Sequence, residues 1–527
     1  MPVIPDHPFP EMGHAFTVDM SADGEWIAVS SYVGARVVRS QVGIYRTADL
    51  SLWHLVELDQ SIEGLAFHPA LPLLAIATEE GDEAYRRGEL VLYEPGTRRR
   101  TAVPFDEVGV TALHWIDERR LEIAVAEPDH AYERDGSDAY LACVAERDDW
   151  RGCLDDVAAG GLAFGPRTPV DDDGPSAWDP IPPRPPLADL ADRAGRTWNR
   201  RDEVVAVEAL TDGRVIAALR CGTLLECWSA EGELLWSVPE PDDFSHRSGG
   251  QLYITPDEET AWVTVLVGRS DDRSTLLRRI ALTDGTQLAE HRLDFPVAIT
   301  ARADGAWVAR DSRDLFPPAR WPPYESRVYT PSGKQLGTLE LGECDRSFDF
   351  HVRRSPRLLF LCRAEEENEK ENSEKWVVEA TPKGIEPLFP FLEDAAPDDY
   401  VMGGPAVYVH DALGPGIVHS VLVNRRNPRL LRRALPHGDI VWTCPTDARV
   451  TGVDTHEGLV HVVTGGHELL TLRADDGKVM HRGTTTDEDT YGPYAFTPCS
   501  LTVAPNGDLL IGTAEGRILV RRSGGLE

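Results

Sequence analysis

Short apolar runs alternate with tight polar turns along almost the whole chain, and the pattern repeats at nearly fixed spacing. In each repeat an apolar run breaks at a turn and resumes as a second apolar run. The turns are Asp23-Gly24, Leu71-Pro72, Asp117-Glu118, Asp212-Gly213, Pro256-Asp257, Asp304-Gly305, Ser355-Pro356, Gly414-Pro415, Glu457-Gly458 and Asn506-Gly507. Runs of about five to eight residues bounded by Asp, Gly and Pro predict β-strands joined by hairpins.

Several repeats show four such runs in succession. Residues 62–105, for example, read IEGLAFHP, LLAIATEE, ELVLYEPG and TRRRTAVPF. A glycine turn precedes the last run of many repeats, and glycine supplies the positive φ that a tight hairpin needs. These glycines are Gly232, Gly285, Gly333, Gly438 and Gly477. Each repeat therefore predicts one four-stranded antiparallel sheet.

Most steps between turns are about 43 to 51 residues long, the period of propeller blades. The sequence thus predicts an all-β protein: a β-propeller of about ten four-stranded antiparallel blades, packed around an axis because one sheet cannot bury both faces alone. Three repeats precede and seven follow a segment rich in Pro and Asp, so one large ring and two packed rings both remain open. We expect an N-terminal segment that is a possible ring-closing strand (1–15), blades 1–3 (16–150), an insertion (151–202) and blades 4–10 (203–527).

Two segments carry a resemblance to known propellers. LAFHPALPLLAIAT (65–78) resembles the inner hairpin of a WD40 repeat, and CWSAEGELLWSVP (227–239) is similar to a quinoprotein-type repeat. The likeness covers roughly residues 14–523 and implies the β-propeller fold of the WD40 and quinoprotein-like superfamily. It singles out no family within that superfamily. Where WD40 repeats carry Trp-Asp, this chain has pairs such as Tyr45-Arg46 and Trp228-Ser229.

The net charge of the chain limits the classes of partner that it can bind. The formal net charge is -35, which disfavours nucleic acids and anionic membranes because both are bound mainly through Lys and Arg. No window approaches 18 uninterrupted apolar residues, and the first residues show no secretory signal. We therefore expect an acidic cytoplasmic protein that binds another protein or peptide.

Motifs for catalysis are missing from the sequence. Gly174-Pro-Ser-Ala-Trp178 lacks the final glycine of a nucleophile elbow, and His467-Glu468 lacks the second histidine of a zinc-protease helix. The sequence favours a non-catalytic propeller that serves as an interaction scaffold or regulatory subunit, with no cofactor. It argues against an enzyme without excluding one.

Polar residues near the end of the first strand of several repeats support an alternative. They are Asp19, His68, His114, His351, His410 and Asp454. In a closed ring these strands line the axis, where imidazoles and carboxylates suit a divalent metal. The chain would then be a metal-dependent hydrolase or lactonase, or a lyase, with its site at the tunnel mouth. Alternatively, each side chain caps its own turn or bonds the backbone of a neighbouring blade.

One aromatic loop is a candidate partner-binding site. DLFPPARWPPYES (314–326) places aromatic residues and an arginine between prolines, the composition of interface hot spots. The predicted contact residues are Phe316, Arg320, Trp321 and Tyr324, with Tyr491 and Tyr494 as a second, smaller cluster. Packing across the tunnel mouth would explain both clusters equally well.

Overall fold

A computed structural model describes most of the chain. The described residues are 3–4, 9, 11–12, 14–33, 39–82, 85–106, 108–126, 140–158, 162–169, 189, 201–220, 222–240, 250–267, 274–311, 326–339, 350–363, 375–381, 384–392, 396, 399, 401–424, 426–486 and 495–522. They form two compact units. Unit 1 comprises Met1–Pro5 and Arg201–Glu527, and unit 2 comprises Asp6–Arg200. In chain order, unit 2 is therefore inserted after the first five residues of unit 1.

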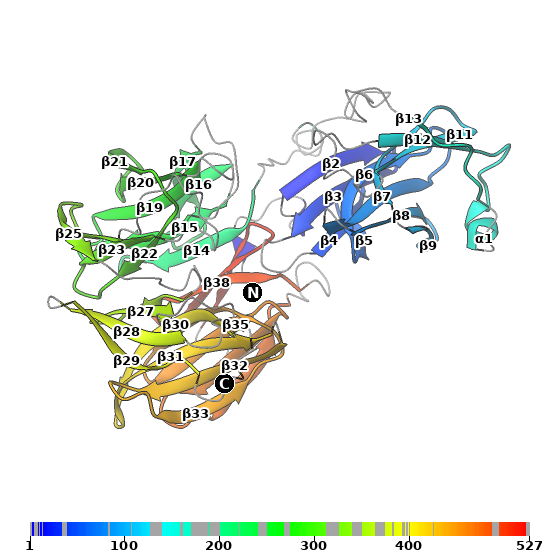
Figure 1. The fold of residues 1–527 in the computed structure, drawn as a ribbon. Helices are drawn as coiled ribbons and strands as arrows, with labels where there is room; N and C mark the ends of the chain where they lie inside the picture. Colours follow the sequence, from blue (N-terminus) through cyan, green and yellow to red (C-terminus); the bar gives the residue numbers. More distant parts are fainter. Residues whose placement is uncertain are drawn as a thin grey trace. The chain divides into compact units, whose positions relative to one another are not determined.

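Unit 1 contains seven sheets among its described residues, which we number ring sheets 1 to 7 in chain order (green to red in Figure 1). Ring sheet 1 consists of β14 (Val204–Ala209), β15 (Val215–Leu219), β16 (Thr223–Trp228) and β17 (Leu234–Pro239). Ring sheet 2 consists of β18 (Leu252–Ile254), β19 (Thr260–Val267), β20 (Ser274–Ala281) and β21 (Gln287–Leu293). Ring sheet 3 consists of β22 (Val297–Ala301), β23 (Trp307–Asp311), β24 (Ser326–Tyr329) and β25 (Gln335–Leu339).

The remaining ring sheets complete the unit. Ring sheet 4 consists of β27 (Leu358–Arg363), β28 (Lys375–Thr381) and β29 (Gly384–Pro390). Ring sheet 5 consists of β26 (Val352–Arg353), β30 (Val401–Asp411), β31 (Gly414–Val423), β32 (Arg426–Ala434) and β33 (Ile440–Pro445). Ring sheet 6 consists of β34 (Val450–His456), β35 (Leu459–Thr464), β36 (Glu468–Arg473) and β37 (Val479–Thr484). Ring sheet 7 consists of β38 (Pro498–Val503), β39 (Leu509–Thr513), β40 (Ile518–Arg521) and β1 (Val3–Ile4).

The seven sheets of unit 1 close into a ring. A buried apolar cluster joins every consecutive pair of ring sheets from 1 to 7. A further cluster, which includes Ile4, Val204 and Leu510, joins ring sheet 7 back to ring sheet 1. First strands of neighbouring sheets contact one another, as β14 does with both β38 and β18, so the first strands lie nearest the axis. The predicted propeller fold is confirmed.

Ring sheet 7 takes its outermost strand from the start of the chain. Val3 and Ile4 pair antiparallel with Leu519 and Ile518 of β40. The sheet therefore reaches four strands although the chain's last repeat supplies only three. Ile4 is buried, and it lies against the hairpin of ring sheet 1 at Gly232. This pairing covers part of an edge that would otherwise be open to association.

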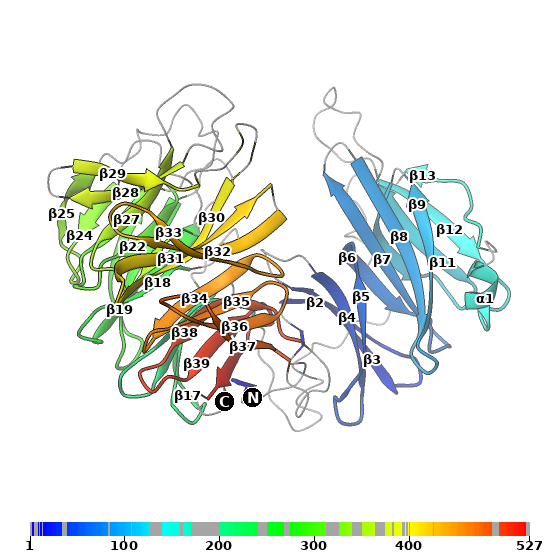
Figure 2. The ribbon, with the colours of Figure 1, turned by 90° about the horizontal axis from the view of Figure 1, so that it is seen from below.

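Unit 2 contains three sheets among its described residues (blue to cyan in Figure 2). The first consists of β2 (His14–Met20), β3 (Trp26–Val33), β4 (Arg39–Arg46) and β5 (Leu52–Leu58). The second consists of β6 (Ser61–Phe67), β7 (Leu74–Asp82), β8 (Tyr85–Glu94) and β9 (Arg99–Asp106). The third consists of β10 (Gly109–Trp115), β11 (Arg120–Ala126), β12 (Tyr140–Glu146) and β13 (Thr168–Pro169), and helix α1 (Cys153–Ala158) follows β12 in the chain. One apolar cluster joins the first and second sheets, and another joins the second sheet to the third and to α1.

The turns read from the sequence fall where the repeat predicts them. Nine of the ten predicted turns connect the first strand of a repeat to its second; at the tenth, Gly414-Pro415 begins β31 and the turn itself is Ala412-Leu413. Eight of the ten sheets have four strands, and in seven of these the four strands follow one another in the chain, as predicted. Ring sheets 4 and 5 differ because β26 pairs in parallel with β30 of the following sheet.

The predicted glycine hairpins also join neighbouring sheets. Gly285 and Gly477 have φ of 77° and 69°. A Cβ on Gly285 would lie 2.8 Å from Cε3 of Trp236 in the preceding sheet, and a Cβ on Gly477 would lie 2.6 Å from Cδ2 of Trp442. Gly438 packs in the same way against Phe389. Glycine is therefore needed at these positions both for its backbone conformation and for the close approach of an aromatic ring.

Candidate functional site

An ionic cluster occupies the centre of the ring. Arg353 follows Val352 in β26, just before the first strand of ring sheet 4. Its Nη2 donates to Glu208 Oε1 in ring sheet 1 at 2.7 Å and to Thr502 Oγ1 in ring sheet 7 at 2.9 Å. It also donates through Nη1 to the carbonyl of Leu501. β26 precedes ring sheet 4 in the chain and pairs with ring sheet 5, and in a ring of seven these two sheets lie on the opposite side of the axis from ring sheet 1, so the Arg353 side chain crosses the axis.

Asp454 of β34 anchors the other half of this cluster. Its fully buried carboxylate accepts from Nε and Nη2 of Arg354 at 2.6 and 2.7 Å, and from the backbone N–H of Val503 at 2.8 Å. Burial alone would raise the pKa of Asp454, but Arg353 and Arg354 outweigh it and lower that pKa to about 2. Burial raises the pKa of Glu208, which Arg353 offsets only in part. The paired charges tie strands of several ring sheets to the fully buried carboxylate of Asp454, although Arg354 itself is exposed.

Three of the six polar first-strand residues bond backbone groups of adjacent sheets. Asp19 accepts from the N–H of Phe67 in the next sheet at 2.7 Å, the same relationship that Asp454 has with Val503. His68 Nδ1 accepts from the N–H of Ala70 and Leu71, both at 3.0 Å, while Nε2 lies 3.0 Å from the carbonyl of Glu118. Burial lowers the pKa of His68, so the neutral ring caps its own turn and bonds the next sheet.

The other three candidates for metal binding lie apart from these contacts. His114 Nε2 is 3.4 Å from Glu122 Oε2, and burial lowers the pKa of His114 while Glu122 partly offsets the effect. The carbonyl of His351 accepts from the N–H of Ala406 at 3.1 Å, and His410 is exposed on β30. Across the described ranges, no three His, Cys, Asp or Glu side chains are grouped so as to hold a metal ion.

The predicted aromatic clusters fall outside the described residues. Phe316, Arg320, Trp321 and Tyr324 lie between β23 and β24, and Tyr491 and Tyr494 lie between β37 and β38. Most of the expected insertion (151–202) is likewise outside them. No helix in the described part of the chain has the length and apolar character to cross a membrane.

A second feature of unit 1 lies on its outermost strands and follows the repeat. Ten large apolar side chains are exposed among the described residues, and eight of them stand two or three residues after the hairpin glycine of a ring sheet. We call these eight the outer rim: Leu234, Leu235, Leu288, Leu336, Ile440, Val441, Val479 and Met480. Their exposed fractions run from 36% to 60%.

The outer rim results from the position of its strands. β17, β21, β25, β33 and β37 are the last strands of their sheets, so one backbone edge of each pairs with no strand in the described structure. Single exposed apolar residues are common on protein surfaces, but repetition at one register marks an interaction surface better than scattered positions do. The strings that carry these residues, such as Gly232-Glu-Leu-Leu-Trp, are visible in the sequence. Their exposure was missed because it depends on which strand lies outermost.

Comparisons with known proteins add little to this description. No family model and no curated protein matches the chain. It is similar to a solved structure titled "Crystal structure of WD40 beta propeller domain of Doa1", with 12% sequence identity and a TM-score of 0.39; the likeness covers 60% of this chain and 92% of that one. Because a likeness at this level carries no argument, the β-propeller fold rests on the sheets and their packing.

Proposed function

We propose that this chain is a non-catalytic, cytoplasmic β-propeller that serves as a scaffold or regulatory subunit and binds other proteins through its outer rim. The observation that carries the proposal is the recurrence of exposed apolar side chains at one register of five ring sheets. At the centre of the ring, Arg353 is already bonded to Glu208 and Thr502, which leaves these side chains engaged with one another.

The energetics of the outer rim suit a partner that contacts more than one ring sheet. Burying apolar surface contributes about 25 cal/mol per Å², so covering one half-exposed Leu contributes about 1 kcal/mol. A single ring sheet therefore offers too little for stable binding. A partner that spans two or three sheets would bury several such side chains. The residues of the aromatic loop (314–326) remain additional candidates for the same role.

A capture experiment with the full chain tests the proposal. The native chain and the variant Leu288→Asp/Leu336→Asp, which alters neighbouring ring sheets 2 and 3, are immobilised and exposed to lysate of the native host. We expect proteins held by the native chain to be lost from this variant. Leu413→Asp is the matched control, because Leu413 is equally exposed but lies in the turn between β30 and β31. Equal capture by all three chains, at unchanged melting temperature, would refute binding through the outer rim.

A further inference from the structure

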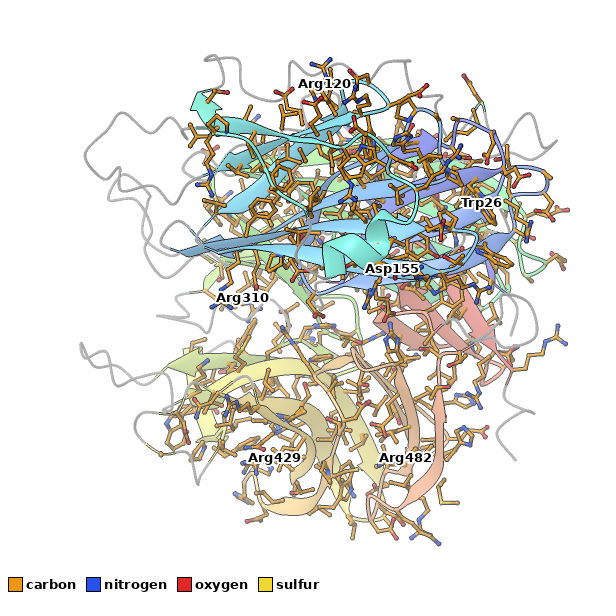
Figure 3. All side chains as sticks on the ribbon, turned by 90° about the vertical axis from the view of Figure 1, so that its right-hand side faces the viewer. Trp26, Arg120, Asp155, Arg310, Arg429 and Arg482 are labelled. Carbon is orange, nitrogen blue, oxygen red and sulfur yellow. The ribbon has the colours of Figure 1, made fainter. Side chains whose placement is uncertain are left out.

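Unit 2 carries a patch of stacked arginine and tryptophan side chains. The guanidinium carbons of Arg46 and Arg98 lie 4.6 and 4.3 Å from the ring centroid of Trp53. Arg46 also lies 5.2 Å from the ring of Trp26, which is labelled in Figure 3. Both arginines are exposed, whereas Trp53 is half-buried and Trp26 is buried. The indoles thus form a fixed base on which the two cations are held.

Arg98 occupies a strained backbone position. Its φ is +59°, and its N–H donates to the carbonyl of Glu94 at 2.9 Å. In ring sheet 6 the equivalent hairpin position is Gly477, whose N–H donates to Arg473 in the same way at 3.0 Å. A left-handed conformation costs a residue other than glycine about 1–2 kcal/mol. Leu50 holds the same hairpin position in the first sheet of unit 2, with φ of 58°, so surrounding packing sustains this conformation in both sheets.

The tryptophan beneath Arg98 is the counterpart of the tryptophans that link the ring sheets. Trp53 is on the outermost strand β5 and donates its indole N–H to the carbonyl of Pro95 in the next sheet at 2.8 Å. Trp442 on β33 donates to Ala474 in the same manner at 2.9 Å. In unit 1 the hairpin residue over the indole is glycine. In unit 2 it is Arg98, which turns a structural contact into a charged surface.

The charges of this patch are not neutralised by ion pairs. Arg46, Arg98 and Arg100 form no ion pair with any carboxylate in the described structure, although Asp49 lies near Arg46. Arg98 and Arg100 donate to the carbonyls of Trp53 and Glu57, both at 3.1 Å.

Arg99 and His54 lie close to this patch and reflect its electrostatic potential. Arg99 forms an ion pair with Asp155 of α1, which is labelled in Figure 3. Burial lowers the pKa of His54, and the nearby Arg98 and Arg100 lower it further, which reflects a positive local potential. A positive patch on a chain of net charge -35 is a local reversal of the surrounding field.

We propose that this Arg–Trp patch (Arg46, Trp53, Arg98 and Arg100) binds a short acidic segment of a partner protein. A guanidinium stacked on an indole presents its N–H groups in the plane of the ring, and those of Arg98 that do not contact the carbonyl of Trp53 can donate to a carboxylate. The complementary ligand is therefore a peptide with two or three neighbouring Asp or Glu side chains. The net charge of -35 repels a long polyanion such as nucleic acid. The site is independent of the outer rim.

The test is a binding titration of the full chain with a fluorescently labelled peptide that contains six consecutive Glu residues. We expect saturable binding that weakens about tenfold between 50 and 300 mM NaCl, since exposed charge pairs are screened by salt. The variant Arg46→Gln/Arg98→Gln should bind at least about tenfold more weakly. The control Arg119→Gln/Arg120→Gln, which alters exposed arginines paired with Asp148 and Asp117, should bind as the native chain does.

The variant Arg98→Gly separates binding from folding. It places the residue of the ring hairpins at the positive-φ position, so the melting temperature should stay the same or rise while peptide binding weakens. Four results would each overturn the proposal: no saturable binding to the native chain, undiminished binding to Arg98→Gly and to the double variant, tighter binding of single-stranded DNA or anionic vesicles at the same residues, or self-association that the peptide competes away.

Discussion

Trp442 in ring sheet 5 lies directly against Gly477 in the hairpin of ring sheet 6, and its indole N–H donates to the carbonyl of Ala474 at 2.9 Å. The same pairing of an aromatic ring with a positive-φ glycine joins Trp236 to Gly285. Each contact lies far from the ring axis, whereas the Arg353 and Asp454 cluster lies on it. Contacts between ring sheets are therefore made both at the outer strands and at the axis, and both kinds stabilise the ring.

Replacing Gly477 should test the contact with Trp442 directly. Gly477→Ala adds a Cβ 2.6 Å from the indole in addition to the cost of positive φ, and we expect it to destabilise the chain by about 2–4 kcal/mol. Gly458→Ala is the matched control, because Gly458 has φ of 78° with no heavy atom within 4 Å of the added Cβ. It should cost about 1 kcal/mol. Urea midpoints measure both, and equal effects would contradict the packing role.

Because β1 pairs with β40, a substitution at Ile4 should destabilise β40. Ile4→Asp places a charge at a buried position of the cluster that joins ring sheets 7 and 1. We expect a lower melting temperature and faster amide exchange at Ile518 and Leu519, which pair with β1. Ile4→Val keeps the strand and should change both measurements little. Unchanged exchange at β40 in Ile4→Asp would show that β1 does not close the ring.

Removing the carboxylate at the ring axis should be costly. Asp454→Asn leaves Arg353 and Arg354 without their buried partner, and we expect a loss of about 3–5 kcal/mol of stability. Arg302→Ala, which breaks an exposed pair with Asp304, should cost no more than about 1 kcal/mol. Because the pKa of Asp454 is about 2, against an ordinary 3.8, its stabilisation is complete above pH 4 and is lost as the pH falls towards 2. Equal losses of stability in Asp454→Asn and Arg302→Ala would show that the axial cluster does not stabilise the ring.

Two buried histidines predict a loss of stability in mild acid. Burial lowers the pKa of His419 to about 3 with a contribution from Arg433, and burial lowers that of His461 to about 4 against the opposing effect of Asp454. Both pKa values lie below the ordinary 6.5, so the unfolded chain binds more protons. Stability is complete above pH 6.5 and should fall by about 1.4 kcal/mol per pH unit for each histidine between pH 6.5 and 4.

His419→Phe should reduce that acid sensitivity. His419 is fully buried beside Phe391, with ring centroids 4.8 Å apart, so an aromatic replacement keeps much of the packing. Urea midpoints measured from pH 7.5 to 4.5 should show a shallower slope for this variant. The exposed His437→Gln should match the native chain. An unchanged slope in His419→Phe would mean that this histidine is accessible to protons in the fold.

The local parts of the fold were predictable from the sequence because they depend on neighbouring residues. A turn such as Asp212-Gly213 and a hairpin glycine such as Gly285 are specified within a few positions, and the structure confirms both. The number of sheets in the ring depends on contacts such as that between Ile4 and the hairpin at Gly232, which no local pattern encodes. The sequence therefore left one ring and two rings equally open.

The candidate sites were less predictable for the same reason. Asp454 was singled out by its place at the end of a first strand, but its partners Arg353 and Arg354 come from a strand about 100 residues earlier. From the sequence alone, a carboxylate near the axis is compatible with metal binding. In the structure the carboxylate of Asp454 is paired with Arg353 and Arg354, and no local pattern indicates that pairing. The outer rim follows a visible sequence register, yet exposure emerges only once Leu288 and Met480 are placed on outermost strands.

Site-specific photo-crosslinking is the most direct test of whether the outer rim of this propeller contacts other proteins. A photoreactive amino acid replaces Leu288 or Met480 in the full chain expressed in its native host, and Leu413 or Ile116 in control chains, which are exposed but off the outer rim. We expect the two rim positions to give a shared, discrete crosslinked protein and the control positions to give none. Crosslinks from Leu413 and Ile116 alone, with none from Leu288 or Met480, would contradict this expectation.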